Sequence, residues 1–129
     1  MTPKIVFTLH GIVCLIFSVQ LIFFYQELLE PYDVEILPIT KGTLLSMRSY
    51  GFLMLAVGIG FLYARNVAQS LGRKALLLIA LLANIPLIFT YSHGILTGVQ
   101  KSDSWLLVGI CFVLAATAGL AFFNEKTEN

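Results

Sequence analysis

Charge is scarce in this sequence. Only 12% of its 129 residues are Asp, Glu, Lys or Arg, about half the share of an ordinary soluble domain. The eight Lys and Arg residues occur singly or as one pair, which excludes the basic patch of a nucleic-acid-binding protein. Hydrophobic residues reach 58%, and the mean hydropathy is +0.89. These values indicate a protein embedded in the lipid bilayer, with nucleic acid excluded as a partner.

Residues suited to redox and metal chemistry are also few. Cys14 and Cys111 lie in apolar stretches without C-x-x-C spacing, which excludes a quinone-linked thiol oxidoreductase and favours packing as small hydrophobic residues. His10 and His93 are expected near opposite faces of the membrane, too far apart to bind one haem iron. We therefore expect no metal, no cofactor and no catalytic residues.

Four apolar stretches dominate the chain, each 20 to 22 residues long: residues 5–26, 43–64, 73–93 and 104–123. A helix of that length, at ~1.5 Å per residue, spans a hydrocarbon core of ~30 Å. Because lipid offers the backbone no hydrogen-bond partner, such stretches are helical. The first is too long for a signal peptide, so we expect it to be retained. The sequence predicts an all-α fold: an integral membrane four-helix bundle of antiparallel spans, one transmembrane domain over residues 1–129.

Basic residues are distributed unevenly over the two ends of such a bundle. Four spans place both termini on the same side as the loop at 65–72, and this side has five Lys or Arg residues against three on the other. Basic residues near span ends favour the cytoplasm, so we expect both termini there. The five are Lys4, Arg65, Arg73, Lys74 and Lys126, and the three are Lys41, Arg48 and Lys101.

Residues typical of turns and helix caps occur in the first and third loops. The first loop contains Pro31 and Pro38, and we expect it to lie on the bilayer surface or on the bundle. Asp103 or Ser104 is expected to cap the fourth span, with Trp105 at the membrane interface.

Small residues recur along the spans at helical spacing, and such lines let helix backbones approach closely in lipid. We expect the second and fourth spans to make the tightest contact. Two interpretations remain open: packing within the bundle, or docking of another subunit on one of the lines. The lines are Ala56, Gly60 and Ala64, and Gly51 and Gly58, on the second span, Ala115 and Gly119 on the fourth, and Gly11 and Ser18 on the first.

Asn84 is a polar residue near the centre of the third span, two residues before Pro86. A polar side chain inside the membrane requires a partner and is a candidate for function. One interpretation is a hydrogen bond to a neighbouring helix or to a carbonyl freed by Pro86. The other is contact with a ligand.

Arg48 lies about five residues, or ~7 Å, inside the second span. Three interpretations are open: pairing with a carboxylate of the first loop, binding of an anion or polar headgroup, or extension of the guanidinium to the interface. Its helical face also carries Gly51 and Gly58, which suggests that it points inward. Counting residues from the membrane boundary places Gln20, Tyr91, His93, Glu27, Glu30 and Asp33 at a depth similar to that of Arg48. Together with Asn84, deeper in the third span, these residues form the predicted polar cluster.

The stretch LLSMRSYGFLMLAVGIGFLYAR has an Arg-x-x-Gly early in the second of four spans and further glycines after it. It resembles small DoxX-like membrane proteins, in particular their uncharacterised bacterial relatives. In those, a basic linker like RNVAQSLGRK follows, and the third span ends in a glycine-containing loop like HGILTGVQKSD. The resemblance covers the whole chain, rests on Arg48, Gly51, Gly58 and the helix spacing, and implies a bacterial inner membrane. Similar small four-span proteins, including the ergosterol-pathway scaffold, act as tethers for other membrane enzymes, and DoxX itself is associated with quinol oxidation.

The leading functional prediction is a non-catalytic accessory or scaffold subunit, which binds other membrane proteins or copies of itself through its helix faces. The alternative is a binder of a quinone, sterol or lipid in a polar-tipped cavity around Arg48, with Tyr50 and Tyr91 in its lining. A small multidrug transporter is disfavoured, because residues 5–26 contain no Asp or Glu for proton coupling.

Overall fold

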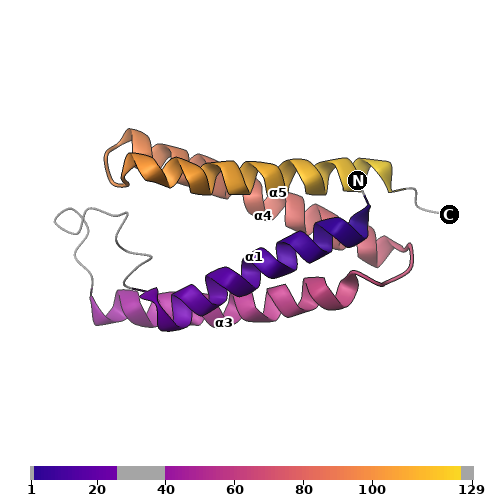
Figure 1. The fold of residues 1–129 in the computed structure, drawn as a ribbon, viewed down its shortest axis with the longest axis horizontal. Helices are drawn as coiled ribbons and strands as arrows, with labels where there is room; N and C mark the ends of the chain where they lie inside the picture. Colours follow the sequence, from indigo (N-terminus) through magenta and orange to yellow (C-terminus); the bar gives the residue numbers. More distant parts are fainter. Residues whose placement is uncertain (1, 26–39, 126–129) are drawn as a thin grey trace.

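The computed structural model describes residues 2–25 and 40–125. This part of the chain forms four long helices and one short 3-10 helix (Figure 1). All four of the longer helices have the length and apolar composition needed to cross a membrane, and the described residues confirm the predicted all-α fold of four helices. The first loop, with Glu27, Glu30, Asp33 and the two prolines, lies outside the described residues. The helices are α1 (Pro3–Phe23), α3 (Lys41–Ala64), α4 (Leu71–Leu96), η1 (Ser102–Ser104) and α5 (Trp105–Asn124).

Local sequence sets where three of these helices begin. Pro3 stands in the first turn of α1, where its missing N–H costs no hydrogen bond. The Thr40 hydroxyl accepts a hydrogen bond from the Thr43 N–H at 3.1 Å and so caps α3. The Ser70 hydroxyl caps α4 in the same way, through the Arg73 N–H at 3.2 Å.

The predicted side-chain cap of the fourth span, by Asp103 or Ser104, is wrong. The chain enters α5 directly from the 3-10 helix η1, and Ser104 has a helical backbone with φ −63° and ψ −9°. A capping side chain requires an extended backbone at that position to reach the N–H groups of the first turn. The Ser104 hydroxyl instead lies buried.

The bundle consists of two helical hairpins: α1 packs along α3, and α4 packs along α5 (Figure 1). The prediction that the second and fourth spans make the tightest contact is therefore wrong. In the α1–α3 hairpin, a Cβ added at Gly11 would lie 3.1 Å from the Gly58 carbonyl oxygen, and one added at Gly58 would lie 3.1 Å from the Gly11 carbonyl oxygen. Gly51 and Gly58 of α3 thus face α1, not α5.

The hydrophobic core lies in the half of the bundle near the two termini. There α1 reaches across to both α4 and α5, and the Phe7 and Phe61 rings stack with centroids 5.8 Å apart. Both termini lie at this end, as expected for four antiparallel spans, and the two hairpins diverge toward the other end (Figure 1). The core residues are Val6, Phe7, Phe61, Ala64, Leu77, Ala80, Ala118 and Ala121.

The small residues predicted to pack helices fall into two groups. Gly51, Gly58, Ala115 and Gly119 are buried, and a Cβ at Gly119 would lie 3.6 Å from the Leu81 side chain. Ala56 and Gly60 are exposed, and a Cβ at Gly60 would have no atom within 4 Å. Residues two positions either side of Gly58 point to nearly the opposite face of a helix with 3.6 residues per turn, so they cannot share its contact with α1.

We predict that Gly58→Leu destabilises the protein, whereas Gly60→Leu on the same helix does not. A side chain at position 58 would force the α1 and α3 backbones apart, and overpacking of this kind costs about 1–3 kcal/mol. Thermal unfolding in detergent measures the difference. Equal melting temperatures for the two variants would contradict the close approach at Gly58.

Candidate functional site

The most buried polar contact between the two hairpins is a hydrogen bond between His10 of α1 and Asn84 of α4. The Asn84 Nδ2 lies 3.2 Å from the His10 Nε2, and the two residues are only 3% and 6% exposed. The Phe61 ring of α3 covers the imidazole, with ring centroids 5.5 Å apart. One polar pair therefore joins α1 to α4 directly beside the core.

The surrounding acceptors determine which atoms of this pair carry hydrogen. The His10 Nδ1 lies 3.0 Å from the Val6 carbonyl oxygen, which can only accept, so Nδ1 is the protonated ring nitrogen. The Nε2 of the neutral ring is then an acceptor, and it receives one hydrogen of the Asn84 amide. The other amide hydrogen goes to the Ala80 carbonyl oxygen at 2.7 Å. All four groups are paired only while His10 is neutral.

For Asn84, the structure shows a hydrogen bond to a neighbouring helix, the first of the two interpretations. The carbonyl that it also uses belongs to Ala80, one turn earlier in α4, and not to Leu82, the carbonyl that Pro86 would free. Its partner His10 was considered in the sequence only as a haem ligand. The sequence did contain a signal for this pair. The first and third predicted spans run in the same direction, so a polar residue inside one span is a candidate partner for a polar residue inside the other.

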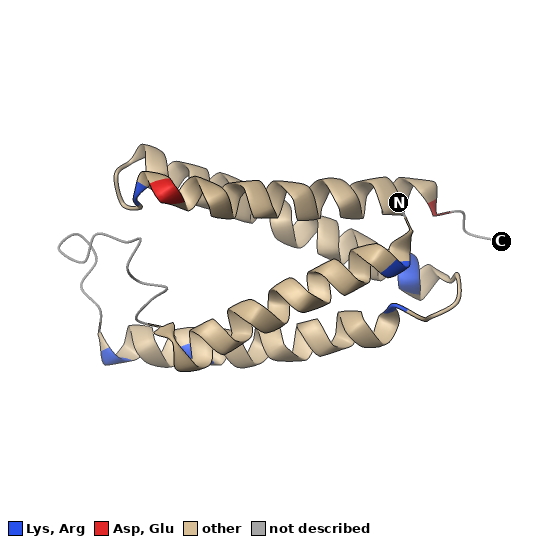
Figure 2. Cartoon of the chain, in the orientation of Figure 1, with Lys and Arg blue, Asp and Glu red and all other residues tan. Residues whose placement is uncertain are grey.

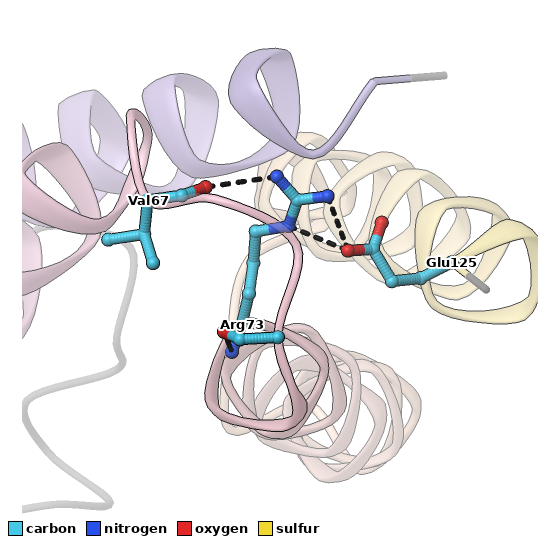
Figure 3. Close-up of polar contacts among 4 residues, drawn as sticks. Val67, Arg73 and Glu125 are labelled. Carbon is cyan, nitrogen blue, oxygen red and sulfur yellow. Dashed lines mark hydrogen bonds and ion pairs between the residues drawn. The ribbon is translucent and has the colours of Figure 1, made fainter. Parts of the chain in front are cut away.

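A second polar contact closes the terminal end of the α4–α5 hairpin (Figure 3). The Arg73 guanidinium of α4 donates through Nε to the Glu125 Oε1 at 2.6 Å and forms an ion pair with the same carboxylate through Nη2. Its Nη1 donates to the Val67 carbonyl oxygen of the preceding loop at 2.9 Å. Arg73 therefore ties the start of α4 to both the loop and the end of α5.

Glu125 is a residue that sequence reasoning missed, because it belongs to the polar stretch NEKTEN at the end of the chain. It is only 7% exposed. The next residue of α4 supports the same end of the hairpin, since the Lys74 ammonium lies 5.4 Å from the centroid of the Phe122 ring. The sequence did contain a signal for this pair. Arg73 stands at the start of the third predicted span and Glu125 just past the end of the fourth, so antiparallel helices bring the two to the same end of the bundle.

Arg48 lies at the other end of the bundle, exposed, with its guanidinium carbon 5.6 Å from the centroid of the Tyr25 ring. Its partner in the described residues is thus an aromatic ring just past α1. The loop carboxylates predicted to pair with it, Glu27, Glu30 and Asp33, lie outside the described residues.

The structure does not bring Asn84 to Arg48, so Asn84 is separate from the polar cluster predicted around Arg48. Asn84 bonds to His10, and α1 rises roughly 20 Å from His10 to its end near Tyr25, at about 1.5 Å per residue. Of the remaining members, Gln20 and Tyr91 are partly buried and His93 is exposed.

Among residues 2–25 and 40–125, no group of three or more His, Cys, Asp or Glu side chains is placed to hold a metal ion. Comparisons with protein-family models, with curated proteins and with solved structures each give no match. The resemblance to DoxX-like proteins stays a prediction from the residues quoted for it.

We predict that Arg73→Gln destabilises the protein by about 1.5–3 kcal/mol, the usual contribution of hydrogen bonds to a charged group. The variant leaves the buried Glu125 carboxylate without its counter-charge. Lys74→Gln is the matched control, since it removes the same charge from the neighbouring residue but no ion pair. The melting temperatures of the two variants in detergent, with Glu125→Gln added to each, give the coupling. A Glu125→Gln change that fails to recover stability in Arg73→Gln would argue against the pair.

We predict that Asn84→Leu destabilises the protein by about 1 kcal/mol, as expected for one hydrogen bond between membrane helices. The single change leaves the buried His10 Nε2 without a donor. The double variant His10→Leu with Asn84→Leu should lose less than the sum of the two single changes, because no unpaired polar atom remains. Strict additivity of the unfolding free energies would contradict direct pairing.

Proposed function

We propose that this chain is a non-catalytic accessory or scaffold subunit, which binds partner membrane proteins through the outer faces of α3 and α4. The observation that carries the proposal is the uneven burial of the four helices. Only 17% of the residues in the most apolar stretch of α3, and of α4, are buried, against 28% for α1 and 33% for α5. The two outer helices therefore retain most of their surface for contacts beyond the chain.

The arrangement of the hairpins supports this division of roles. Helix α1 contacts all three other helices, whereas α3 packs mainly against α1 and α4 mainly against α5. In lipid, an exposed apolar helix face is satisfied equally by lipid tails and by another helix, so shape decides which one binds. A face with small residues favours a helix, because the two backbones can then approach closely.

Helix α3 carries such a face on the side away from α1. Ala56 and Gly60 are one turn apart there, both are exposed, and no atom of the described chain occupies the space beside Gly60. Four of the exposed hydrophobic residues of α3 lie around this line: Phe52, Leu53, Val57 and Ile59. We infer that the partner is another membrane protein or a second copy of the chain, seated on this face.

We also propose a multi-pass protein of a bacterial inner membrane with cytoplasmic termini. In the described residues, the terminal end carries Lys4, Arg65, Arg73 and Lys74, against Glu125 as the acid (Figure 2). The opposite end carries Lys41, Arg48 and Lys101 with Asp103. The excess of basic residues near the terminal end is the direction that the positive-inside tendency requires.

The second candidate is a binder of a lipophilic molecule, such as a quinone, sterol or lipid, near Arg48. The exposed guanidinium of Arg48 beside the Tyr25 ring favours it, because these groups together suit a polar or anionic headgroup.

To test the scaffold, the tagged full-length chain is purified in mild detergent as wild type, Gly60→Leu and Gly109→Leu. Both glycines have open space where a side chain would extend, one on α3 and the other on α5, so neither change disturbs internal packing. We expect a membrane protein, or a second copy, in stoichiometric amount with wild type and Gly109→Leu, and its loss with Gly60→Leu.

Mass spectrometry of the intact purified complex reads both stoichiometry and small-molecule content. A lipid or quinone retained at one per chain without any protein partner would overturn the scaffold and support the second candidate. If Gly60→Leu retained a protein partner as well as the wild type does, the docking face would not be on α3.

A further inference from the structure

We propose that the His10–Asn84 hydrogen bond is a proton-sensitive latch, in which protonation of the His10 Nε2 releases the α1–α3 hairpin from the α4–α5 hairpin. The inference does not depend on what binds the outer faces. It follows from the count of donors and acceptors at the contact and from the charges available around it.

Protonation removes the acceptor on which the contact between the hairpins depends. A histidinium donates from both ring nitrogens, so its Nε2–H would face the Asn84 amide hydrogens. Rotation of the amide would present its oxygen to Nε2 instead, but the same rotation would turn that oxygen toward the Ala80 carbonyl, now 2.7 Å from the amide nitrogen. Either arrangement sets two like groups against each other, so at least one hydrogen bond is lost.

No carboxylate of the four helices can stabilise the charge. Pro3–Phe23, Lys41–Ala64, Leu71–Leu96 and Trp105–Asn124 contain no Asp or Glu. The side chain that α3 presents to the imidazole is Phe61, which offers a ring face or edge but no acceptor oxygen. The backbone carbonyls of Val6 and Ala80 can accept from the histidinium. They supply no counter-charge, however, so the buried charge gains further stabilisation from water, which reaches this contact only if the hairpins separate.

The titratable and charged groups of the packed elements do not change this. Helix α5 contributes one titratable side chain, Cys111, and those of α4 are cationic or lie at its ends. Helices α1 and α3 add cations, two tyrosines and Cys14. The complete set is Lys4 and Cys14 on α1, Lys41, Arg48, Tyr50 and Tyr63 on α3, Arg73, Lys74, Tyr91 and His93 on α4, and Cys111 on α5.

The hairpins are built to separate as units. Within each hairpin the helices pack along their length, whereas the contacts between hairpins are fewer and are mostly those of α1 with α4 and α5. Loss of the latch therefore acts on the weakest interface of the bundle. The far ends, which already diverge, should move furthest (Figure 1).

The test measures the distance between the far ends of the hairpins by pulsed electron paramagnetic resonance in lipid nanodiscs, with spin labels on Leu45→Cys and Leu106→Cys. These residues lie near the starts of α3 and α5 and are 69% and 71% exposed, so the labels disturb no packing. The native cysteines are replaced as Cys14→Ala and Cys111→Ala. The pH is lowered from about 8 to about 5, the range in which histidine changes charge.

We expect the distance distribution to shift to longer values at the lower pH and to return when the pH is restored. His93→Gln should show the same shift, because it removes the second of the two histidines, which is exposed. His10→Gln should abolish the shift, because an amide can donate to Val6 and accept from Asn84 but does not titrate.

No shift in the parent protein, or an equal shift in His10→Gln, overturns the proposal. Should His10→Gln fail to fold, Asn84→Leu provides the second measurement. Without the amide, the distances should already be long at the higher pH and change little on acidification. If Asn84→Leu instead showed short distances between the spin labels at the higher pH and the full shift on acidification, the proposed latch would also be overturned.

Discussion

The close approach of α1 and α3 at Gly11 and Gly58 is the contact on which the rest of the arrangement depends. Each carbonyl oxygen lies 3.1 Å from the position that a Cβ of the opposite glycine would occupy, so the two backbones meet without side chains between them. This contact fixes the register of the hairpin. It places His10, the residue before Gly11, against Phe61, one turn after Gly58, and thereby turns the imidazole toward α4.

The four long apolar helices could be predicted from the sequence because the length and hydropathy of each stretch decide them. Helix pairing could not be read from any single line of small residues, since α3 has two lines on nearly opposite faces and both permit close packing. The decisive information lay in matching two helices. Gly11 and Ser18 are seven residues apart, as are Gly51 and Gly58, and antiparallel alignment brings Gly11 to Gly58 and Ser18 to Gly51. The structure has both contacts, with the Ser18 carbonyl oxygen 3.2 Å from a Cβ at Gly51.

The candidate site was harder to predict, because depth along a helix is only one coordinate of a side chain. Arg48 and Asn84 do not meet, because Asn84 bonds to His10 whereas Arg48 lies beside Tyr25, roughly 20 Å farther along α1 at about 1.5 Å per residue. Asn84 was recognised as a residue in need of a partner, and that requirement is correct. Its partner His10 and the acid Glu125 went unrecognised, because pairing across helices depends on crossing geometry that composition does not contain.

The same separation of faces connects the fold to the proposed function. Gly58 and Gly51 use one side of α3 for the internal contact, and Ala56 and Gly60 lie on nearly the opposite side because two residues turn a helix by about 200°. A partner seated on the outer line would therefore leave the glycine contact and the core intact.

Separation of the hairpins would also leave that line unchanged, because Ala56 and Gly60 move with α3 as part of one unit. Partner binding and the state of the latch are thus independent in this fold unless a partner spans both hairpins. A partner that touched both α3 and α4 would bind one separation of the hairpins better than the other, and the protonation of His10 would then control its affinity.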